Sequence, residues 1–264
     1  MKIRASSLGL LLIALATLSI IIVSAWMPDL DVTLAERLFD PTSKTFPIAS
    51  ISVLELLRRQ GLASVVGVVA CIGAALLVKF MLPRRRLLIP GRAIIFLALT
   101  LAIGPGLLVN VVLKPHWGRP RPVEIVQFGG HEPYIPWWKS NGPCSSNCSF
   151  VSGESSVAAW LFAPAVLIPP PWRAAAMGAA AVFTVAIDLS RMAFGGHFFT
   201  DVAFGTLMTL LVIWVTYGLI FLWPRTRLDE QIIERRMSKF SCRLRRMLFC
   251  ATRNKATPRA NADT

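Results

Sequence analysis

Three short segments carry residues whose types and spacing suit chemistry on a phosphate group. The first is the cationic run at residues 114–122, the second is Ser-Phe-Val-Ser-Gly-Glu at residues 149–154, and the third runs from Ser190 to Asp201. Each lies where a hydrophobic segment begins or ends, so all three can meet at one face of a membrane. Together they predict a phosphate site at the edge of a bilayer.

Lys114, Arg121 and Arg191 are candidate ligands for the phosphate oxygens. Arginine offers two parallel donors and lysine a compact charge, so the three side chains can neutralise and orient one phosphoryl group. A single basic residue at the end of a membrane span is more often an anchor at the interface. Here the cations cluster on the translocated side, where topology requires no positive charge, and this favours a phosphate clamp.

His197 and Asp201 are four residues apart where the last hydrophobic segment begins, which predicts that they lie on one helical face. A carboxylate at that spacing can accept from Nδ1–H and turn Nε2 toward the phosphate as a nucleophile. The plainer alternative is an aspartate at a helix N-terminus beside an interfacial histidine. Arg191, six residues before His197, favours catalysis.

Ser152 and Gly153 open another hydrophobic segment. The hydroxyl and the backbone N–H groups of such a helix N-terminus can bind an anion, although ordinary helix capping uses the same donors. Glu154 follows directly. A carboxyl group at this position, beside low-dielectric lipid, is a candidate acid for the leaving oxygen.

The elements that must position these residues are six apolar segments, which predict an all-α integral membrane protein with a bundle of six transmembrane helices. Composition agrees, because 55% of the 264 residues are hydrophobic and the mean hydropathy is +0.59. Four segments reach the length that spans a bilayer, whereas the fourth and fifth do so only if their polar flanks enter the bundle. The first also resembles a signal peptide, but its long apolar core favours an uncleaved helix. The segments are residues 8–26, 62–82, 93–113, 157–168, 174–189 and 202–223.

The distribution of charge predicts the orientation. There are 28 Lys and Arg against 14 Asp and Glu, and the basic residues gather before the first span, between the second and third, and after residue 223. The positive-inside rule then places both termini in the cytoplasm of a bacterial inner membrane and all three motifs in the periplasm. Nucleic-acid binding, the other common cause of such basicity, is disfavoured by the apolar spans.

Two units are predicted along the chain. Residues 1–223 form the membrane domain, and residues 224–264 form a basic cytoplasmic tail that is partly helical on anionic lipid or else disordered.

Cys144 and Cys148 share the predicted periplasmic loop, where an oxidising environment permits a disulfide, with two free thiols as the alternative. No set of four metal ligands accompanies them, so neither metal nor other cofactor is expected.

The three motifs resemble the signatures of the type-2 phosphatidic acid phosphatase (PAP2) superfamily. The pattern is Lys114-x6-Arg121-Pro, Ser152-Gly, and Ser-Arg191-x5-His197-x3-Asp. The resemblance implies a six-helix membrane bundle and metal-independent hydrolysis of lipid phosphates through a phosphohistidine. It implies that His197 is the nucleophile, that Asp201 orients it, and that phosphate is bound by Lys114, Arg121, Ser152, Gly153 and Arg191. One departure is Glu154, which stands where the family usually has a histidine acting as general acid.

Longer stretches, at residues 103–110, 114–122, 148–154 and 195–199, resemble bacterial lipid A 4'-phosphatases, which carry an acidic residue at the Glu154 position. That resemblance covers roughly residues 8–223 and implies removal of the 4'-phosphate of lipid A or its tetraacylated precursor. The loss of charge would weaken binding of cationic antimicrobial peptides.

Several alternative functions stay open. A lipid A 1-phosphatase, an undecaprenyl pyrophosphate phosphatase and a phosphatidylglycerophosphate phosphatase would share the same clamps. Discrimination among these substrates is expected in the loop 123–143, at His131, Tyr134, Trp137 and Trp138. A protein that only binds a lipid phosphate would need neither His197 nor Asp201. The oligomeric state and the acyl-chain preference have no signal in the sequence.

Overall fold

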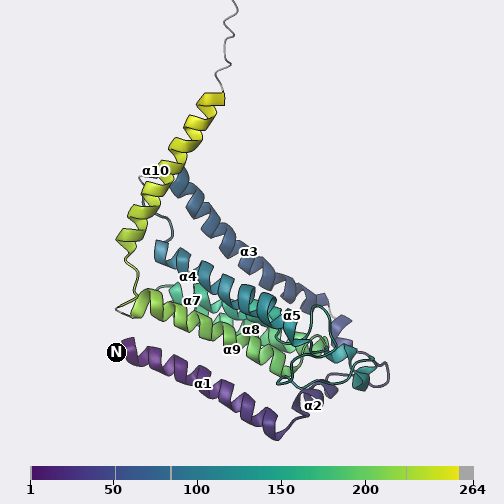
Figure 1. Ribbon diagram of the computed structural model, residues 1–264. Helices are drawn as coiled ribbons and strands as arrows, with labels where there is room; N and C mark the ends of the chain where they lie inside the picture. Colours follow the sequence, from purple (N-terminus) through teal and green to yellow (C-terminus); the bar gives the residue numbers. More distant parts are fainter. Residues whose placement is uncertain (1, 51, 84, 224, 256–264) are drawn as a thin grey trace, which may run out of the picture.

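The structure is a computed structural model that describes residues 2–50, 52–83, 85–223 and 225–255. Over these residues the chain is helical, with isolated bridges joining Asp40 to Thr45 and Ile125 to Glu132. The long helices run roughly side by side as a bundle (Figure 1). They are α1 (Lys2–Trp26), α3 (Ser52–Met81), α4 (Gly91–Leu101), α8 (Arg173–Ala193) and α9 (Phe199–Tyr217).

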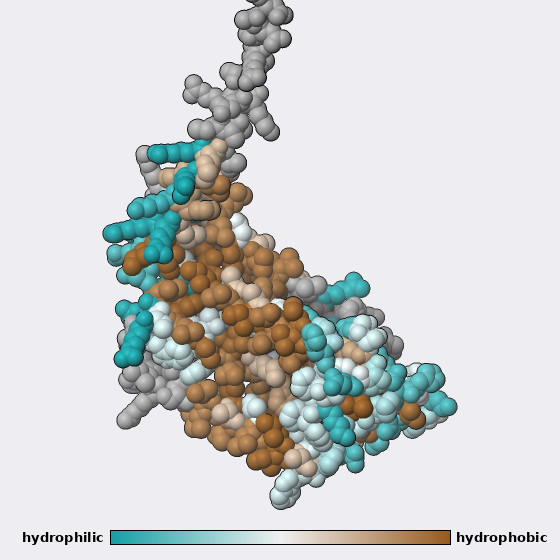
Figure 2. Space-filling model, viewed as in Figure 1, coloured by the Kyte–Doolittle hydropathy of each residue, from teal (hydrophilic) through white to brown (hydrophobic). Residues whose placement is uncertain are grey.

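In the part of the chain that the structure describes, five helices are long and apolar enough to cross a membrane: Leu8–Trp26, Ala63–Met81, Gly91–Glu124, Arg173–Ala193 and Phe199–Leu222. Their side chains form a broad hydrophobic band between two hydrophilic regions (Figure 2). The predicted all-helical membrane class is confirmed. The helix observed at the predicted fifth segment is longer than the apolar run of residues 174–189, because α8 continues to Ala193. The fourth is a shorter unit, Gly153–Leu167, so the predicted number of six spans is not established.

One continuous helical rod delivers Lys114 to the end of the bundle. It starts as α4, widens into the π-helical stretch η2 (Ala102–Leu113), and ends as α5 (Lys114–Trp117). The widening contains Pro105, which has no N–H to donate to the preceding turn and whose ring crowds that turn. The side-chain amide of Asn110 donates to the Pro105 carbonyl at 2.7 Å.

Helix α9 lies at the centre of the bundle and packs against α6 (Gly153–Trp160). Ser156 and Thr209 join the two helices by a 2.6 Å hydrogen bond between their hydroxyls. A β-carbon on Gly205 would lie 2.7 Å from the Ser152 carbonyl, so only glycine lets α9 approach the start of α6 this closely. This contact brings the second and third motifs together.

At the opposite end of the bundle, α10 (Glu230–Lys255) lies across the ends of α3 and α4 (Figure 1). Glu230 accepts from the backbone N–H groups of Gly91 and Arg92, at 2.5 and 3.1 Å, and so satisfies the first donors of α4. Glu234 accepts from Lys79 Nζ at 3.3 Å. The predicted tail therefore contains a helix fastened to the bundle, and residues 256–264 lie outside the described residues.

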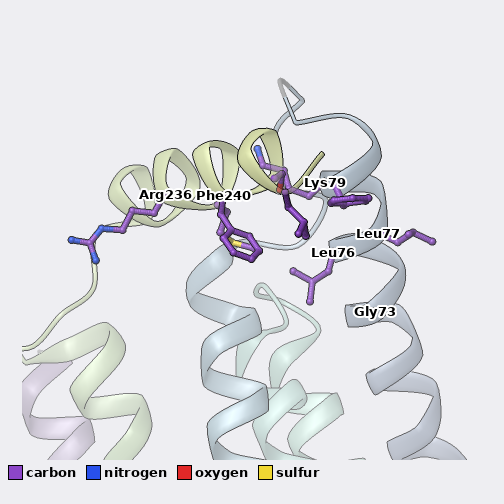
Figure 3. Close-up of a pocket in the computed structure, with 10 residues that line it drawn as sticks. Gly73, Leu76, Leu77, Lys79, Arg236 and Phe240 are labelled. Atoms are coloured by element: carbon purple, nitrogen blue, oxygen red, sulfur yellow. The ribbon is translucent and has the colours of Figure 1, made fainter. Parts of the chain in front are cut away.

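A groove of about 680 Å³ runs between α3 and α10 (Figure 3). Its walls are mostly apolar, and Lys79 and Arg236 are the two charged residues among those that line it. It lies at the end away from the three motifs. The remaining lining residues are Gly73, Leu76, Leu77, Phe80, Met237, Phe240, Ser241 and Leu244.

Candidate active site

The three predicted segments converge at one end of the bundle, which we call the site end. Lys114 ends the α4 rod, Ser152 caps α6, and Arg191 lies in the last turn of α8. His197 follows in the short link to α9, and the charges of Lys114, Arg121 and Arg191 all act on its ring. The site is thus assembled from residues that are up to 87 positions apart in the sequence, counted from Lys114 to Asp201.

Four charged side chains lie close together at the site end. Lys114 is within electrostatic reach of Arg121, Arg191 and Glu154. Arg191 Nε lies 3.7 Å from Glu154 Oε2, and Arg121 donates to the Asn147 carbonyl from Nε at 3.2 Å and from Nη2 at 2.8 Å. Three cations against one carboxylate leave an excess of positive charge, which suits an anionic ligand.

The link between α8 and α9 fixes Arg191 relative to His197. The Arg191 carbonyl accepts from the N–H groups of Gly196 and His197, at 3.1 and 3.3 Å. A β-carbon on Gly196 would lie 2.6 Å from Arg191 Nη2, so the guanidinium packs directly over this glycine. The third motif therefore presents its cation and its histidine as one compact turn.

His197 is 2% exposed. Burial lowers the pKa of its ring well below the ordinary value, and the nearby charges of Arg191, Arg121 and Lys114 lower that pKa further. Nδ1 lies 2.8 Å from the Ser149 carbonyl oxygen, which can only accept, so Nδ1 carries the proton and donates. The ring is therefore neutral at neutral pH, and Nε2 keeps its lone pair.

The geometry around Asp201 differs from the prediction. Asp201 Oδ2 lies 3.9 Å from His197 Nδ1, beyond hydrogen-bond length. The prediction assumed that both residues lie on one helix, but α9 begins at Phe199 and leaves His197 in the preceding link. Asp201 Oδ2 instead accepts from Ser149 Oγ at 2.5 Å, and Ser149 provides the carbonyl that holds the ring. The carboxylate thus reaches His197 through Ser149.

Arg119 is a buried residue at this site that the sequence interpretation overlooked. Its side chain is fully buried and forms ion pairs with Asp201 and with Asp31 on the short helix α2 (Leu30–Glu36). In the sequence Arg119 is one of several basic residues in the 114–122 run, and Asp31 is 88 positions away. Residue type and spacing contain no signal that separates this buried cation from Lys114 and Arg121, the predicted phosphate ligands of the same run.

The second motif supplies a helix cap. Ser152 is fully buried, and its Oγ accepts from the Ser155 N–H at 3.3 Å and from Ser155 Oγ at 2.8 Å. Its oxygen therefore acts as the acceptor that caps the N-terminus of α6. A β-carbon on Gly153 would lie 4.0 Å from Lys114 Nζ, so the first turn of α6 lies beside that cation. Glu154, in the same turn, has a side chain that is 39% exposed.

The loop between the first two motifs is folded back over the site end. A disulfide joins Cys144 to Cys148, whose Cα atoms are 5.8 Å apart. Trp137 donates from Nε1 to Ser24 Oγ of α1 at 3.0 Å, and Tyr134 donates to the Pro28 carbonyl at 3.3 Å. Two of the four residues predicted to select the substrate thus anchor the loop. Two others, His131 and Trp138, are exposed.

No group of three or more His, Cys, Asp or Glu side chains that could hold a metal ion gathers in the described part of the chain. The positive charge at the described site comes from Lys114, Arg121 and Arg191.

Comparison with known proteins finds a matching family and several similar proteins. The profile of the PAP2 superfamily matches residues 93–225. A lipid A 4'-phosphatase of Francisella tularensis subsp. novicida is 40% identical over 159 residues, which is 60% of this chain and 69% of the relative. No solved structure matches the chain.

Two further relatives are lipid A 4'-phosphatases of Rhizobium leguminosarum and Rhizobium etli. Each is 46% identical, over 113 and 112 residues. These matches span 43% and 42% of this chain and 48% and 44% of the relatives, so the similarity to the Rhizobium proteins covers about half their length. The family match includes the rod, α6, α8 and α9, and the chain belongs to the PAP2 superfamily of phosphatases.

Proposed function

We propose that this protein is a membrane lipid phosphomonoesterase that removes the 4'-phosphate of lipid A through a phosphohistidine on His197. The observation that carries the proposal is a buried histidine, with Nδ1 bonded to the Ser149 carbonyl, set among Lys114, Arg121 and Arg191. Such a neutral ring has a lone pair on Nε2 and lies beside a cluster of cations. That arrangement suits nucleophilic attack on a phosphoryl group.

The first step transfers the phosphoryl group to the enzyme. His197 Nε2 attacks phosphorus, the P–N bond forms, and the bond from phosphorus to the sugar oxygen breaks. Lys114, Arg121 and Arg191 hold the equatorial oxygens and stabilise their charge in the transition state. Protonated Glu154 gives its proton to the leaving oxygen, because this carboxyl lies beside the same cations, with Oε2 3.7 Å from Arg191 Nε.

The second step reverses these roles. Ionised Glu154 takes a proton from water as the water oxygen attacks phosphorus, and the P–N bond breaks. Inorganic phosphate leaves, His197 regains its neutral form, and Glu154 is again protonated. Each atom and proton is accounted for by these side chains, so the proposed cycle requires no metal ion.

The proposed orientation places the site end in the periplasm. The opposite end carries a row of cations on α10, at Arg235, Arg236, Lys239, Arg243 and Arg246, together with Arg85, Arg86 and Arg92 near the start of α4. Positive charge of this density favours the cytoplasmic side. The disulfide between Cys144 and Cys148 belongs in an oxidising compartment and lies at the site end. Both termini would then be cytoplasmic.

Selection of the 4' position rests on the names of the relatives and on Glu154. The exposed Trp138 and His131 lie on the loop over the site end, where they can contact sugar or acyl groups. A lipid A 1-phosphatase, an undecaprenyl pyrophosphate phosphatase and a phosphatidylglycerophosphate phosphatase would use the same clamps. The test must therefore identify the product, not only the release of phosphate.

The deciding experiment uses the full chain, purified in detergent, with bisphosphorylated lipid A as substrate. Mass spectrometry should find a product that keeps the 1-phosphate and lacks the 4'-phosphate, at a rate unchanged by EDTA. Loss of the 1-phosphate would overturn the positional assignment. Binding of lipid A with no release of phosphate would overturn the enzymatic assignment in favour of a lipid-phosphate-binding protein.

A further inference from the structure

We propose that Asp31 is a positioning residue for the reaction, acting on His197 through the buried chain Arg119, Asp201 and Ser149. The inference rests on the proposed function of His197. Asp31 lies on α2, outside the residues 93–225 that the family profile matches. A short helix after the first span would thus hold part of the catalytic geometry.

Asp31 is 2% exposed and binds the start of α9. Its Oδ1 accepts from the Thr200 N–H at 3.0 Å, and its Oδ2 accepts from Thr200 Oγ1 at 2.6 Å. The first N–H groups of a helix have no partner within the helix. Asp31 provides the Thr200 N–H with an acceptor from a separate segment. A carboxylate at this place also interacts favourably with the positive end of the helix dipole.

Arg119 connects Asp31 to Asp201. It donates from Nη2 to Asp31 Oδ2 at 2.7 Å, from Nη1 to Thr200 Oγ1 at 2.9 Å, and from Nη1 to Asp201 Oδ1. The side chains of Arg119 and Asp201 are fully buried. Removing one member of such a buried group leaves the other charges uncompensated, so their geometry depends on all three.

Two contacts carry this geometry to His197. The Ser149 hydroxyl donates to Asp201 Oδ2 at 2.5 Å, and the Ser149 N–H donates to the Arg119 carbonyl at 2.8 Å. Ser149 is therefore held from both sides by the Arg119–Asp201 pair. Its carbonyl accepts from His197 Nδ1 at 2.8 Å and so sets the direction of the ring.

The charges of the network are also suited to the reaction. Two carboxylates share one guanidinium, so an excess of negative charge remains behind Ser149. Attack by Nε2 places positive charge on the imidazole, which a preorganised negative charge stabilises. Asp31 is the member that creates this excess, because Arg119 and Asp201 alone would be neutral as a pair.

The main test replaces Asp31 by asparagine in the full chain and measures steady-state kinetics of phosphate release from lipid A. The substitution Asp31→Asn keeps the shape and removes the charge. We expect kcat to fall about 10- to 100-fold, the range known for groups that orient metal ligands. KM should stay within about twofold, because the phosphate clamps remain. The matched control is Asp29→Asn, two residues earlier, which is exposed and has no side-chain cap bond.

A double-substitution cycle separates positioning from a purely structural role. Ser149→Ala removes the hydroxyl link to Asp201 and keeps the carbonyl that holds the ring. If Asp31 acts through this link, Asp31→Asn should lower kcat much less in the Ser149→Ala background than in the native one. Fully additive effects on kcat, or a change in the amount of folded protein with kcat per folded molecule unchanged, would overturn the proposal.

Thr200→Val covers the case in which Asp31→Asn does not fold. It removes the hydroxyl shared by Asp31 and Arg119 without changing charge or shape, and it should lower kcat with KM unchanged. An unaltered kcat in that variant would refute the inference. A wild-type protein that releases no phosphate from any lipid would instead refute the proposed function, so the two failures are distinguishable.

Discussion

Arg119 at the site end lies fully buried between two carboxylates, whereas Lys79 and Arg92 at the opposite end pair with Glu234 and Glu230, whose side chains are each 28% exposed. Partly exposed ion pairs contribute little free energy because water and salt screen them. A fully buried network is costly to disrupt, because water cannot solvate a charge that has lost its partner.

The two ends also differ in what their carboxylates bind. Glu230 accepts from backbone N–H groups at the start of α4 and so attaches one helix to another. Asp201 accepts from Arg119 and Ser149, and the chain of contacts ends on the ring of His197. Buried charge at the site end is therefore expected to affect chemistry, and charge at the α10 end only the docking of a helix.

The largest expected effect is the loss of the nucleophile. His197→Ala should lower kcat at least about 10⁴-fold, because the proposed phosphoenzyme forms on this ring. Phosphate release from lipid A measures this loss. His116→Ala is the matched control, since His116 is exposed on α5 near the same site. Substantial turnover by His197→Ala would refute the assignment of the nucleophile.

The next largest effect is expected for a glutamate at the site end. Glu154→Gln should lower kcat about 10²- to 10⁴-fold, because both proton transfers of the proposed cycle pass through this carboxyl. Acid-labile phosphate on His197 should accumulate if water attack becomes the slower step. Near-normal turnover in Glu154→Gln would leave Glu154 as a contact for substrate and not as acid and base.

A smaller effect concerns pH. Because the pKa of His197 is lowered well below its ordinary value of about 6.5, kcat/KM should stay level as pH falls through 6.5 and decline only nearer the lowered pKa. The free energy of unfolding is expected to fall as pH falls over the same interval. Neutral His197 contributes stability above about pH 6.5, and that contribution is lost as pH falls toward the lowered pKa. His197→Ala should show less loss of thermal stability over that interval, and an identical loss would contradict the argument.

The smallest expected effect is at the opposite end. Glu230→Gln weakens the contact between α10 and the start of α4, and it should lower the free energy of unfolding by about 0.3–1 kcal/mol. Turnover should stay within about twofold of the wild type. Thermal unfolding in detergent and phosphate release measure the two quantities. A tenfold loss of kcat would show that the two ends are coupled and would break the comparison.

The membrane class and most of the candidate site followed from the sequence, for local reasons. A run of apolar residues predicts a membrane span wherever it lies in the chain. Arg191 and His197 lie close together because the residues between them form one compact turn. The apolar run of the fifth segment ends at residue 189, and α8 reaches spanning length because part of its polar flank continues the helix to Ala193, as the prediction required.

Residue types and short-range spacing therefore determined that this protein is helical and lies in a membrane, and the resemblance of its three motifs to the PAP2 signatures identified the phosphatase family. Tertiary structure decided which group holds the His197 ring, because His197 precedes α9 and meets the Ser149 carbonyl instead of Asp201. It also decided that Arg119 is an internal counter-ion. Burial between Asp31 and Asp201 depends on contacts across 88 and 82 positions, and no local pattern encodes such a contact.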